Sequence, residues 1–323
     1  MRVLFLGSPQ EVVPVLDFLR HDPTFIANHK LVGVVSQPAR PIGRGGKIAN
    51  PPVAEYALNA GLPLLQPESV KDPQFLAAMK AVSPDIALTA AYGQILTRDF
   101  LTIPKRATIN IHPSLLPRHR GAVPVPAALL AGDSETGVTV LFTVRKLDAG
   151  HIILQEKTLI DPDTTAELLL RSLFLQGARM IVPALTKLAD PHYEGTPQDE
   201  SHATHCRKIE KDDGRVDWND PPQVIVNKYR AFEPWPGTFT YAGDRRIALA
   251  AVSIPVSAAI SPLKPGQFTF DKRQKVLLVG CGDHCCVAVK EVRPAGGKHM
   301  DAASFWNGLK DRDHTFFTSE ARP

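Results

Sequence analysis

Residues 86–112, IALTAAYGQILTRDFLTIPKRATINIH, contain two short apolar segments, Ile86–Ala90 and Thr108–Ile111, with the length and composition of buried β-strands. Two similar segments precede them, at Arg2–Leu6 and Lys30–Val35. Stretches with apolar residues at helical spacing lie between these strands. Strands that alternate with helices are typical of a parallel sheet with crossover connections, so the sequence predicts a Rossmann-like α/β domain. The predicted helices are Val12–Arg20, Pro52–Ala60 and Pro73–Ala81.

The rest of the chain is predicted to hold the end of this domain, a linker and a second domain. A strand at Val138–Val144 and a long helix at Thr164–Leu188 complete the first domain, residues 1–189. Residues 190–205 are rich in Pro, Gly, Ser, Thr and acidic residues, which indicates a linker. Residues 206–323 contain short strand-like runs separated by Gly and Pro, which is typical of a small, OB-like β-barrel. These runs are Thr238–Tyr241, Ile247–Val252, Val276–Val279 and Cys285–Val292.

The charge of the chain is unevenly distributed. The net charge is +4, and residues 1–205 carry 19 basic and 19 acidic residues, so the excess lies in residues 206–323 with 18 and 14. Lys and Arg gain free energy by releasing the counterions that condense on phosphates, so this half could bind a polyanion. A mildly basic surface with no such partner explains the charge equally well.

Cysteines and apolar runs indicate a cytoplasmic protein. The four cysteines, Cys206, Cys281, Cys285 and Cys286, show no arrangement of a secreted disulfide framework. Cys281, His284 and Cys285 crowd one short segment and cannot form a tetrahedral zinc site without further ligands, so no metal is expected. The apolar run at the amino end is too short for a signal peptide, and no later run approaches the ~20 residues of a membrane span, so no membrane is expected.

The residues best suited to catalysis lie at the end of the strand Thr108–Ile111. Side chains alternate along a strand, so Asn110 and His112 share one face while their neighbours enter the core. Pro113 ends the strand, which places the pair at its carboxyl end, where ligands of open α/β sheets bind.

Asp148 follows the strand Val138–Val144 and is predicted to reach the same strand edge. Together the three groups suit acyl transfer, since Asn110 can donate to an oxyanion and His112 can move a proton. Asp148 would fix the tautomer of the imidazole. Alone, such fragments also fit a satisfied polar pair at a strand end and an ordinary turn.

Three segments in order resemble one enzyme family. Asn110–Gly121, Glu135–Thr139 and Leu147–Gly150 together resemble the formyltransferases that use 10-formyltetrahydrofolate. The resemblance implies that residues 1–189 transfer the formyl group of this donor to an amine, with the three side chains Asn110, His112 and Asp148 as catalytic residues.

The resemblance also implies where the folate binds. Gly93 would let the backbone approach the flat pterin, and Ile95 and Leu96 would supply apolar walls. The implied folate contacts are Tyr92, Gly93, Gln94, Ile95, Leu96, Ser114, Leu115, Leu116 and Pro117.

Further segments resemble the branch of the family whose acceptor is the methionine of initiator tRNA, and they extend along essentially the whole chain. This resemblance implies a monomer whose residues 206–323 bind tRNA. The basic loop Arg40–Lys47 suits a segment that becomes ordered on RNA, although alone it also fits an exposed loop. The implied tRNA contacts are Arg40, Arg44, Lys47 and Lys208. The matching segments are Met1–Pro9, Ser36–Lys47, Lys208–Trp218, Arg230–Gly237 and Pro294–Met300.

Three positions depart from the family pattern. His151 replaces an acid, Gly46 replaces a lysine, and His119 occupies a position that is commonly aromatic. They leave the reaction as expected but put the strength of RNA binding in doubt.

Several alternatives stay open at this stage. A formyltransferase acting on an amino sugar or another small amine, and a formyltetrahydrofolate hydrolase, could use the same three groups. A non-catalytic tRNA-binding protein would not need them. A nucleotide-dependent oxidoreductase is disfavoured, because Gly7–Glu11 lacks the glycine spacing that admits a pyrophosphate.

Overall fold

The computed structural model describes residues 1–42, 46–255, 263–309 and 316–320. By contacts between Cα atoms the chain forms two compact units. The first unit comprises residues 1–125, 134–160 and 168–207, and the second comprises residues 126–133, 161–167 and 208–323. The second unit therefore includes two short segments that precede residue 168 in the chain.

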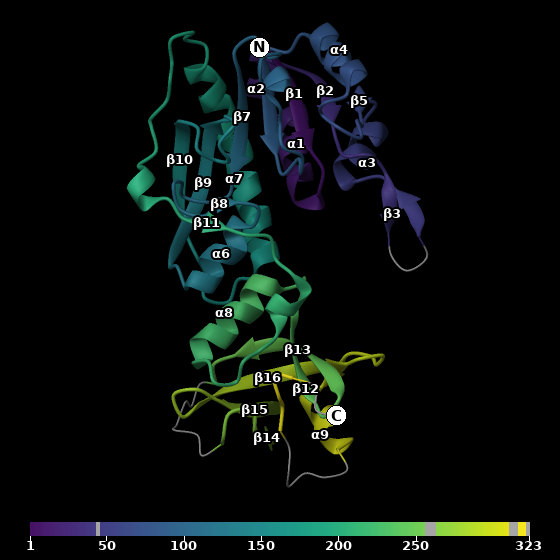
Figure 1. Cartoon of the computed structure of the whole chain (residues 1–323), viewed down its shortest axis with the longest axis vertical. Helices are drawn as coiled ribbons and strands as arrows, with labels where there is room; N and C mark the ends of the chain where they lie inside the picture. Colours follow the sequence, from purple (N-terminus) through teal and green to yellow (C-terminus); the bar gives the residue numbers. More distant parts are fainter. Residues whose placement is uncertain (43–45, 256–262, 310–315, 321–323) are drawn as a thin grey trace. The chain divides into compact units, whose positions relative to one another are not determined.

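A seven-stranded sheet forms the centre of the first unit (Figure 1). Five of its strands are parallel, which confirms the predicted α/β domain. The predicted strands agree closely with the observed ones because each is an apolar run that is buried in the sheet. In spatial order the strands are β10 (Ile152–Leu159), β9 (Glu135–Phe142), β7 (Ala107–His112), β6 (Ile86–Ala90), β1 (Arg2–Gly7), β2 (Lys30–Val35) and β5 (Leu64–Leu65).

Helices connect these strands, and the sequence defines where several of them begin. Asp22 and Asp72 each accept a hydrogen bond from a backbone amide of the first turn, and a proline follows each of them. The helices are α1 (Val13–His21), α2 (Pro23–Asn28), α3 (Pro52–Asn59), α4 (Pro73–Val82), α5 (Arg98–Leu101), α6 (Pro124–Ala131) and α7 (Ala166–Lys187).

Helix α7 covers one face of the sheet. A Cβ atom built on Gly177 would lie 2.5 Å from Ile111 and 3.1 Å from Val138, so the helix packs directly on β7 and β9. The opposite face of β7 carries Asn110 and His112. Within the described part of the chain, α7 is the one helix long and apolar enough to cross a membrane, and half of its apolar window is buried in the fold, as in core helices of globular proteins.

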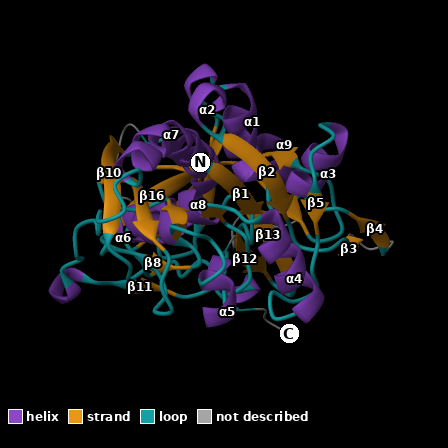
Figure 2. Cartoon of the chain, turned by 90° about the horizontal axis from the view of Figure 1, so that it is seen from above, coloured by secondary structure: helices purple, strands orange, loops and turns teal. Residues whose placement is uncertain are grey.

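Two small sheets complete the first unit. Strands β8 (Arg120–Gly121) and β11 (His205–Cys206) pair in parallel, with Gly121 opposite Cys206. The amide of Val123 also donates to the sulfur of Cys206, which lies 83 residues further along the chain. Strands β3 (Arg40–Ile42) and β4 (Lys47–Ala49) form a hairpin that stands away from the large sheet of this unit (Figure 2).

The second unit contains an antiparallel sheet, as predicted for this half of the chain. Both of its edge strands have a hydrogen-bonded partner in one short segment, because Thr318 pairs with Tyr241 and Phe316 pairs with Gln267. This segment connects the two edges, while the OB-like topology stays a prediction. The elements are α8 (Pro222–Phe232), β12 (Thr238–Ala242), β13 (Arg245–Ser253), β14 (Phe268–Asp271), β15 (Val276–Cys281), β16 (Cys285–Pro294), β17 (Met300–Asp301) and α9 (Ala302–Asn307).

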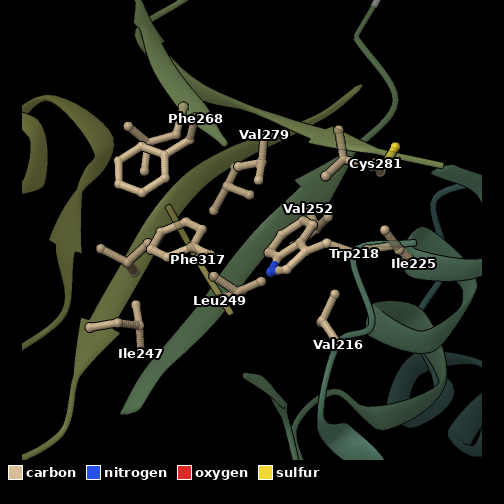
Figure 3. Packing of buried hydrophobic residues seen from close by; sticks show 14 of the residues in the cluster. Val216, Trp218, Ile225, Ile247, Leu249, Val252, Phe268, Val279, Cys281 and Phe317 are labelled. Carbon is tan, nitrogen blue, oxygen red and sulfur yellow. The ribbon is translucent and has the colours of Figure 1, made fainter. Parts of the chain in front are cut away.

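Aromatic side chains fill the interior of this second sheet (Figure 3). Phe317 stacks on Phe268 with ring centroids 4.2 Å apart, and on Trp218 at 5.9 Å. The indole nitrogen of Trp218 donates to the hydroxyl of Thr240, so its burial leaves no polar atom unpaired. The segment that joins the two sheet edges is therefore also anchored in the core.

Candidate active site

Asn110 presents an oriented amide on β7. The hydroxyl of Thr89, in the adjacent strand β6, donates to Oδ1 of Asn110 at 2.7 Å. Among the described residues no other hydrogen bond involves this amide. Its Nδ2 group, a donor, is consequently directed away from Thr89 and is available to a ligand.

His112 is the last residue of β7, and only 3% of its surface is exposed. Its Nε2 lies 3.0 Å from the carbonyl oxygen of His119, and its Nδ1 lies 3.6 Å from Oδ2 of Asp148. Both of these oxygens are acceptors. The carbonyl of His119 is within hydrogen-bond distance of Nε2, and the carboxylate of Asp148 faces Nδ1.

Asp148 is held by backbone geometry as well as by charge. Its φ angle is +49°, in the left-handed region, and its Oδ2 accepts a hydrogen bond of 2.9 Å from the amide of Gly121. The same oxygen faces His112. The structure therefore brings the predicted imidazole and carboxylate together, on the sheet face to which the Asn110 side chain also belongs.

Asp148 reaches this position through the residues that follow β9. Strand β9 is antiparallel to β7, with Phe142 opposite Ile109 and Thr139 opposite His112, so β9 ends beside the start of β7. Asp148 nevertheless lies 3.6 Å from His112 at the end of β7, although its own strand β9 ends elsewhere. Residues 143–151 instead carry it back to His112, because β9 adds to the edge of the parallel strands in the reverse direction.

Models of known families match both halves of the chain. A model described as "Formyl transferase" matches residues 1–185, and one described as "Formyl transferase, C-terminal domain" matches residues 208–310. The chain belongs to the formyl transferase family. It is thus an enzyme that transfers a formyl group, which confirms the resemblance seen in its sequence segments.

Full-length relatives of this formyl transferase are known. It is 39% identical to a methionyl-tRNA formyltransferase of Chloroflexus aggregans over 310 residues, covering 96% of this chain and 97% of the relative. It is 34% identical to the methionyl-tRNA formyltransferase of Staphylococcus epidermidis over 312 residues, covering 96% and 97%. Its fold also resembles WlaRD, a sugar 3N-formyl transferase solved with dTDP and 5-N-formyl-THF, with a TM-score of 0.65 at 16% identity over 90% of this chain and 97% of that one.

The residues predicted to bind folate lie in two loops of the formyl transferase, after β6 and after β7. These adjacent strands are parallel, so both loops leave the sheet at the same edge. Their side chains are of two kinds. Those of Tyr92, Ser114 and Leu116 are buried and belong to the protein interior.

Tyr92 and Ser114 have structural contacts. Burial raises the pKa of Tyr92 to about 12, and its hydroxyl has no hydrogen-bond partner in the described structure. The hydroxyl of Ser114 donates to the carbonyl of Arg118 at 2.8 Å, while Leu116 is fixed through its amide and carbonyl. The side chains of these three residues therefore support the two loops from inside the protein.

The tip of the loop after β6 is exposed and apolar. Ile95 is 86% exposed and Leu96 is half-buried. Gly93 has a φ of +87°, and a Cβ atom there would lie 2.5 Å from the amide nitrogen of Gln37, so the position favours glycine. Gln94 fixes the loop from within by accepting from the amide of Val70 at 3.0 Å. An exposed isoleucine on a fixed loop fits a flat aromatic ligand.

The residues predicted to bind tRNA lie in both units. Arg40 and Lys47 are exposed on the β3–β4 hairpin of the first unit, and Arg40 forms an ion pair of 2.7 Å with Glu68. Lys208 is exposed in the second unit. Arg44 lies outside the described residues.

One of the three departures from the family pattern, His119, contacts the catalytic histidine. The carbonyl of His119 accepts from His112, and its φ of +60° holds that carbonyl in place. His151 is exposed, and its Nδ1 lies 2.9 Å from the carbonyl of Glu194. Gly46 has a φ of +61° in the hairpin, a backbone conformation that suits glycine better than lysine.

Several residues around the catalytic groups were not identified from the sequence. Thr89 orients Asn110, and Gly121 binds the carboxylate of Asp148. Gln198 donates to the backbone of the turn that carries Asp148, although it lies in the predicted linker. Gly121 closes the recognised Asn110–Gly121 segment and could have been found from it, whereas Thr89 and Gln198 carry no sequence signal of their own.

Other features of the described structure lie away from this site. A surface hollow of about 350 Å³ is lined by Arg2, Lys30 and Asp85, at the amino ends of parallel strands and so at the opposite edge from His112. Within the described ranges no group of three or more His, Cys, Asp or Glu side chains is placed to bind a metal ion.

Proposed function

We propose that this formyl transferase moves the formyl group of 10-formyltetrahydrofolate to the α-amine of methionyl initiator tRNA, giving N-formylmethionyl-tRNA for translation initiation. The observation that carries the reaction is the 3.6 Å approach of Asp148 to His112 on the sheet face of Asn110. The acceptor is supported by relatives named methionyl-tRNA formyltransferase that match over nearly the whole chain.

The three side chains have distinct roles in the proposed reaction. The neutral methionine amine attacks the formyl carbon, and the Nδ2 group of Asn110 donates to the oxygen that becomes negatively charged. The bond between the formyl carbon and N10 of the folate then breaks, and the proton lost by the amine nitrogen passes to N10. His112 carries this proton, and the bound formyl group competes with the carbonyl of His119 for Nε2.

The donor is proposed to lie against the two loops after β6 and β7. Ile95 and Leu96 provide the apolar contacts, and the backbone of Ser114–Pro117 borders the formyl group. The exposure of Ile95 at the tip of a loop that Gln94 fixes supports this placement. The folate supplies the activated formyl group, and the protein supplies orientation and hydrogen bonds.

The tRNA is proposed to bind basic residues of both units. Arg40, Arg44 and Lys47 of the hairpin grip phosphates, and Lys208 lies at the start of the second unit, where the excess positive charge is found. We further propose that the enzyme works as a monomer in the cytoplasm.

One experiment tests the acceptor. The purified enzyme is incubated with 10-formyltetrahydrofolate and either charged initiator tRNA, charged elongator tRNA or an amino sugar nucleotide, and the formylated product is measured. Preferential formylation of the initiator tRNA is expected. Formylation of the amino sugar alone would show that the acceptor is a small amine, and release of free formate in every reaction would indicate a hydrolase.

A further inference from the structure

Two polar side chains behind the catalytic turn have no part in the reaction described above. Arg120 is fully buried and is the largest such side chain in the described structure. Gln198 comes from residues 190–205, which the sequence presents as a linker. Both lie next to Asp148 in the fold of the first unit.

Gln198 holds the turn that carries Asp148. Its Nε2 group donates to the carbonyl of Asp148 at 2.8 Å and to the carbonyl of Gly150 at 2.7 Å. One amide therefore uses both of its hydrogens on the two ends of a three-residue turn. Since Asp148 has a left-handed φ, this turn needs such external support.

Arg120 fixes the other end of Gln198. The Oε1 atom of Gln198 accepts from Nε and Nη2 of Arg120 at 3.0 and 2.7 Å. Arg120 also binds both carboxylate oxygens of Glu200, at 2.9 and 3.1 Å. A buried guanidinium with all of these partners has a single orientation, and so does the amide attached to it.

The backbone closes this network on the carboxylate itself. Gly121 follows Arg120 in the chain, and its amide is the donor to Oδ2 of Asp148. The amide of Arg120 donates to the carbonyl of Thr204 at 2.9 Å, which joins residues 198–206 to the same segment. Asp148 is thus held from its backbone by Gln198 and from its side chain by Gly121, and Arg120 connects the two.

We infer that Gln198, supported by Arg120, is a positioning residue that sets the orientation of the Asp148 carboxylate toward His112. Gln198 acts through the turn and does not touch the reacting atoms. This inference rests on the proposed role of Asp148. A displacement of a catalytic group by a fraction of an ångström is enough to lower turnover substantially.

Two substitutions of Gln198 separate this role from a merely structural one. Gln198→Met keeps the length of the side chain and removes all of its hydrogen bonds. Gln198→Glu keeps the acceptor for Arg120 but loses the donor to the carbonyls of Asp148 and Gly150. Gln176→Met is the matched control, because in the described structure that amide binds Thr158 and Glu156 and not the turn that carries Asp148.

The measurements are kcat, both KM values and the effect of each change in an Asp148→Ala background. We expect kcat to fall about tenfold in both Gln198 variants, with KM for folate and tRNA within twofold and the control unaffected. In the Asp148→Ala background, Gln198→Met should cause no further loss, because the carboxylate that it orients is absent.

Three outcomes would overturn the inference. Normal kcat in Gln198→Glu would mean that the amide serves only to hold Arg120. A full, multiplicative loss in the Asp148→Ala background would mean that it acts independently of the carboxylate. Normal turnover of Asp148→Ala itself would instead refute the proposed catalytic role, and with it the need to position this group.

Discussion

The turn around Asp148 and the β3–β4 hairpin are both functional segments that the sequence singled out, yet the structure holds them very differently. The turn is bound at its carboxylate by Gly121 and at its backbone by Gln198. The hairpin has three pairs of backbone partners, and its described basic side chains, Arg40 and Lys47, are exposed. The single ion pair of Arg40 with Glu68 lies at the surface.

This difference reflects what each segment must do. A group that acts on a reacting atom has to be in place before the substrate arrives, so it is fixed by buried hydrogen bonds. A segment that binds a folded RNA can become ordered on its partner, because charge attracts at long range and tolerates many geometries. The turn should therefore respond strongly to single substitutions, and the hairpin weakly.

The largest effects are expected from the catalytic side chains. Asn110→Ala, His112→Ala and Asp148→Ala should each lower kcat by a factor on the order of 10² or more, because each removes a group that stabilises the transition state. Initial rates of tRNA formylation at saturating donor measure this. Near-normal rates in all three folded variants would show that these preorganised side chains are not needed for the reaction.

A smaller loss is expected when Asn110 is left in place but no longer oriented. Thr89→Val removes the hydroxyl that donates to Oδ1 of Asn110, and kcat should fall about fivefold to tenfold while KM is unchanged. Thr108→Val is the matched control, since the buried hydroxyl of Thr108 has no hydrogen-bond partner among the residues that the structure describes. Equal kcat values for the two variants would contradict the assigned role of Thr89.

Substitutions in the hairpin should have weaker effects, and these effects should appear in the binding of tRNA. Arg40→Ala and Lys47→Ala should each raise KM for tRNA about threefold and leave KM for folate unchanged, because each removes one phosphate contact. Lys157→Ala, an exposed lysine on β10, is the control. Activity on tRNA should also fall steeply with added salt, and a response to salt as flat as that of a neutral substrate would exclude the hairpin from an RNA site.

The smallest effect concerns stability. Hydrogen bonds from Arg120 and Lys146 lower the pKa of Glu200 to about 2. Because the pKa is lowered, the charged carboxylate stabilises the fold at pH values above its ordinary pKa of 4.5. This stabilisation is lost as the pH falls toward 2. Because Glu200 is 56% exposed, solvent screens the effect.

Glu200→Gln should therefore be slightly less stable than the parent protein at pH 7, and the difference should shrink between pH 4.5 and pH 2. Urea unfolding at a series of pH values measures this. A difference that grows on acidification would have the wrong sign for this ion pair.

The sequence predicted most of the fold of the first unit because burial and periodicity determine it. Strands β2 and β6 begin and end at the predicted residues, since each is a short, mostly apolar run. Strand β10 was not predicted, because its residues 155–157 are polar and exposed. Helix α8 was missed as well, since its apolar residues are interrupted by polar ones that the second unit buries, among them Asn227 and Arg230.

The catalytic residues were predictable and their supports were not. Asn110 and His112 follow from the alternation of a strand, and the recognised segments supplied Asp148. Hydrogen bonds across long sequence separations cannot be read from local patterns. Thr89 lies 21 residues from Asn110, and Gln198 lies 50 residues from Asp148. Residues 190–205 have the composition of a linker, yet Gln198 and Glu200 bind the buried Arg120.

The short segment Phe316–Thr318 matters for how the second unit is made. It pairs with Tyr241 of β12 and with Gln267 beside β14, so both edges of the sheet depend on it for hydrogen bonds. During synthesis on the ribosome these strands emerge before the segment does, and until then their unpaired backbone groups can bind other nascent chains. A premature stop codon ahead of Phe316 would release a protein whose edge strands lack these partners. Such a product should aggregate even though every catalytic residue is present.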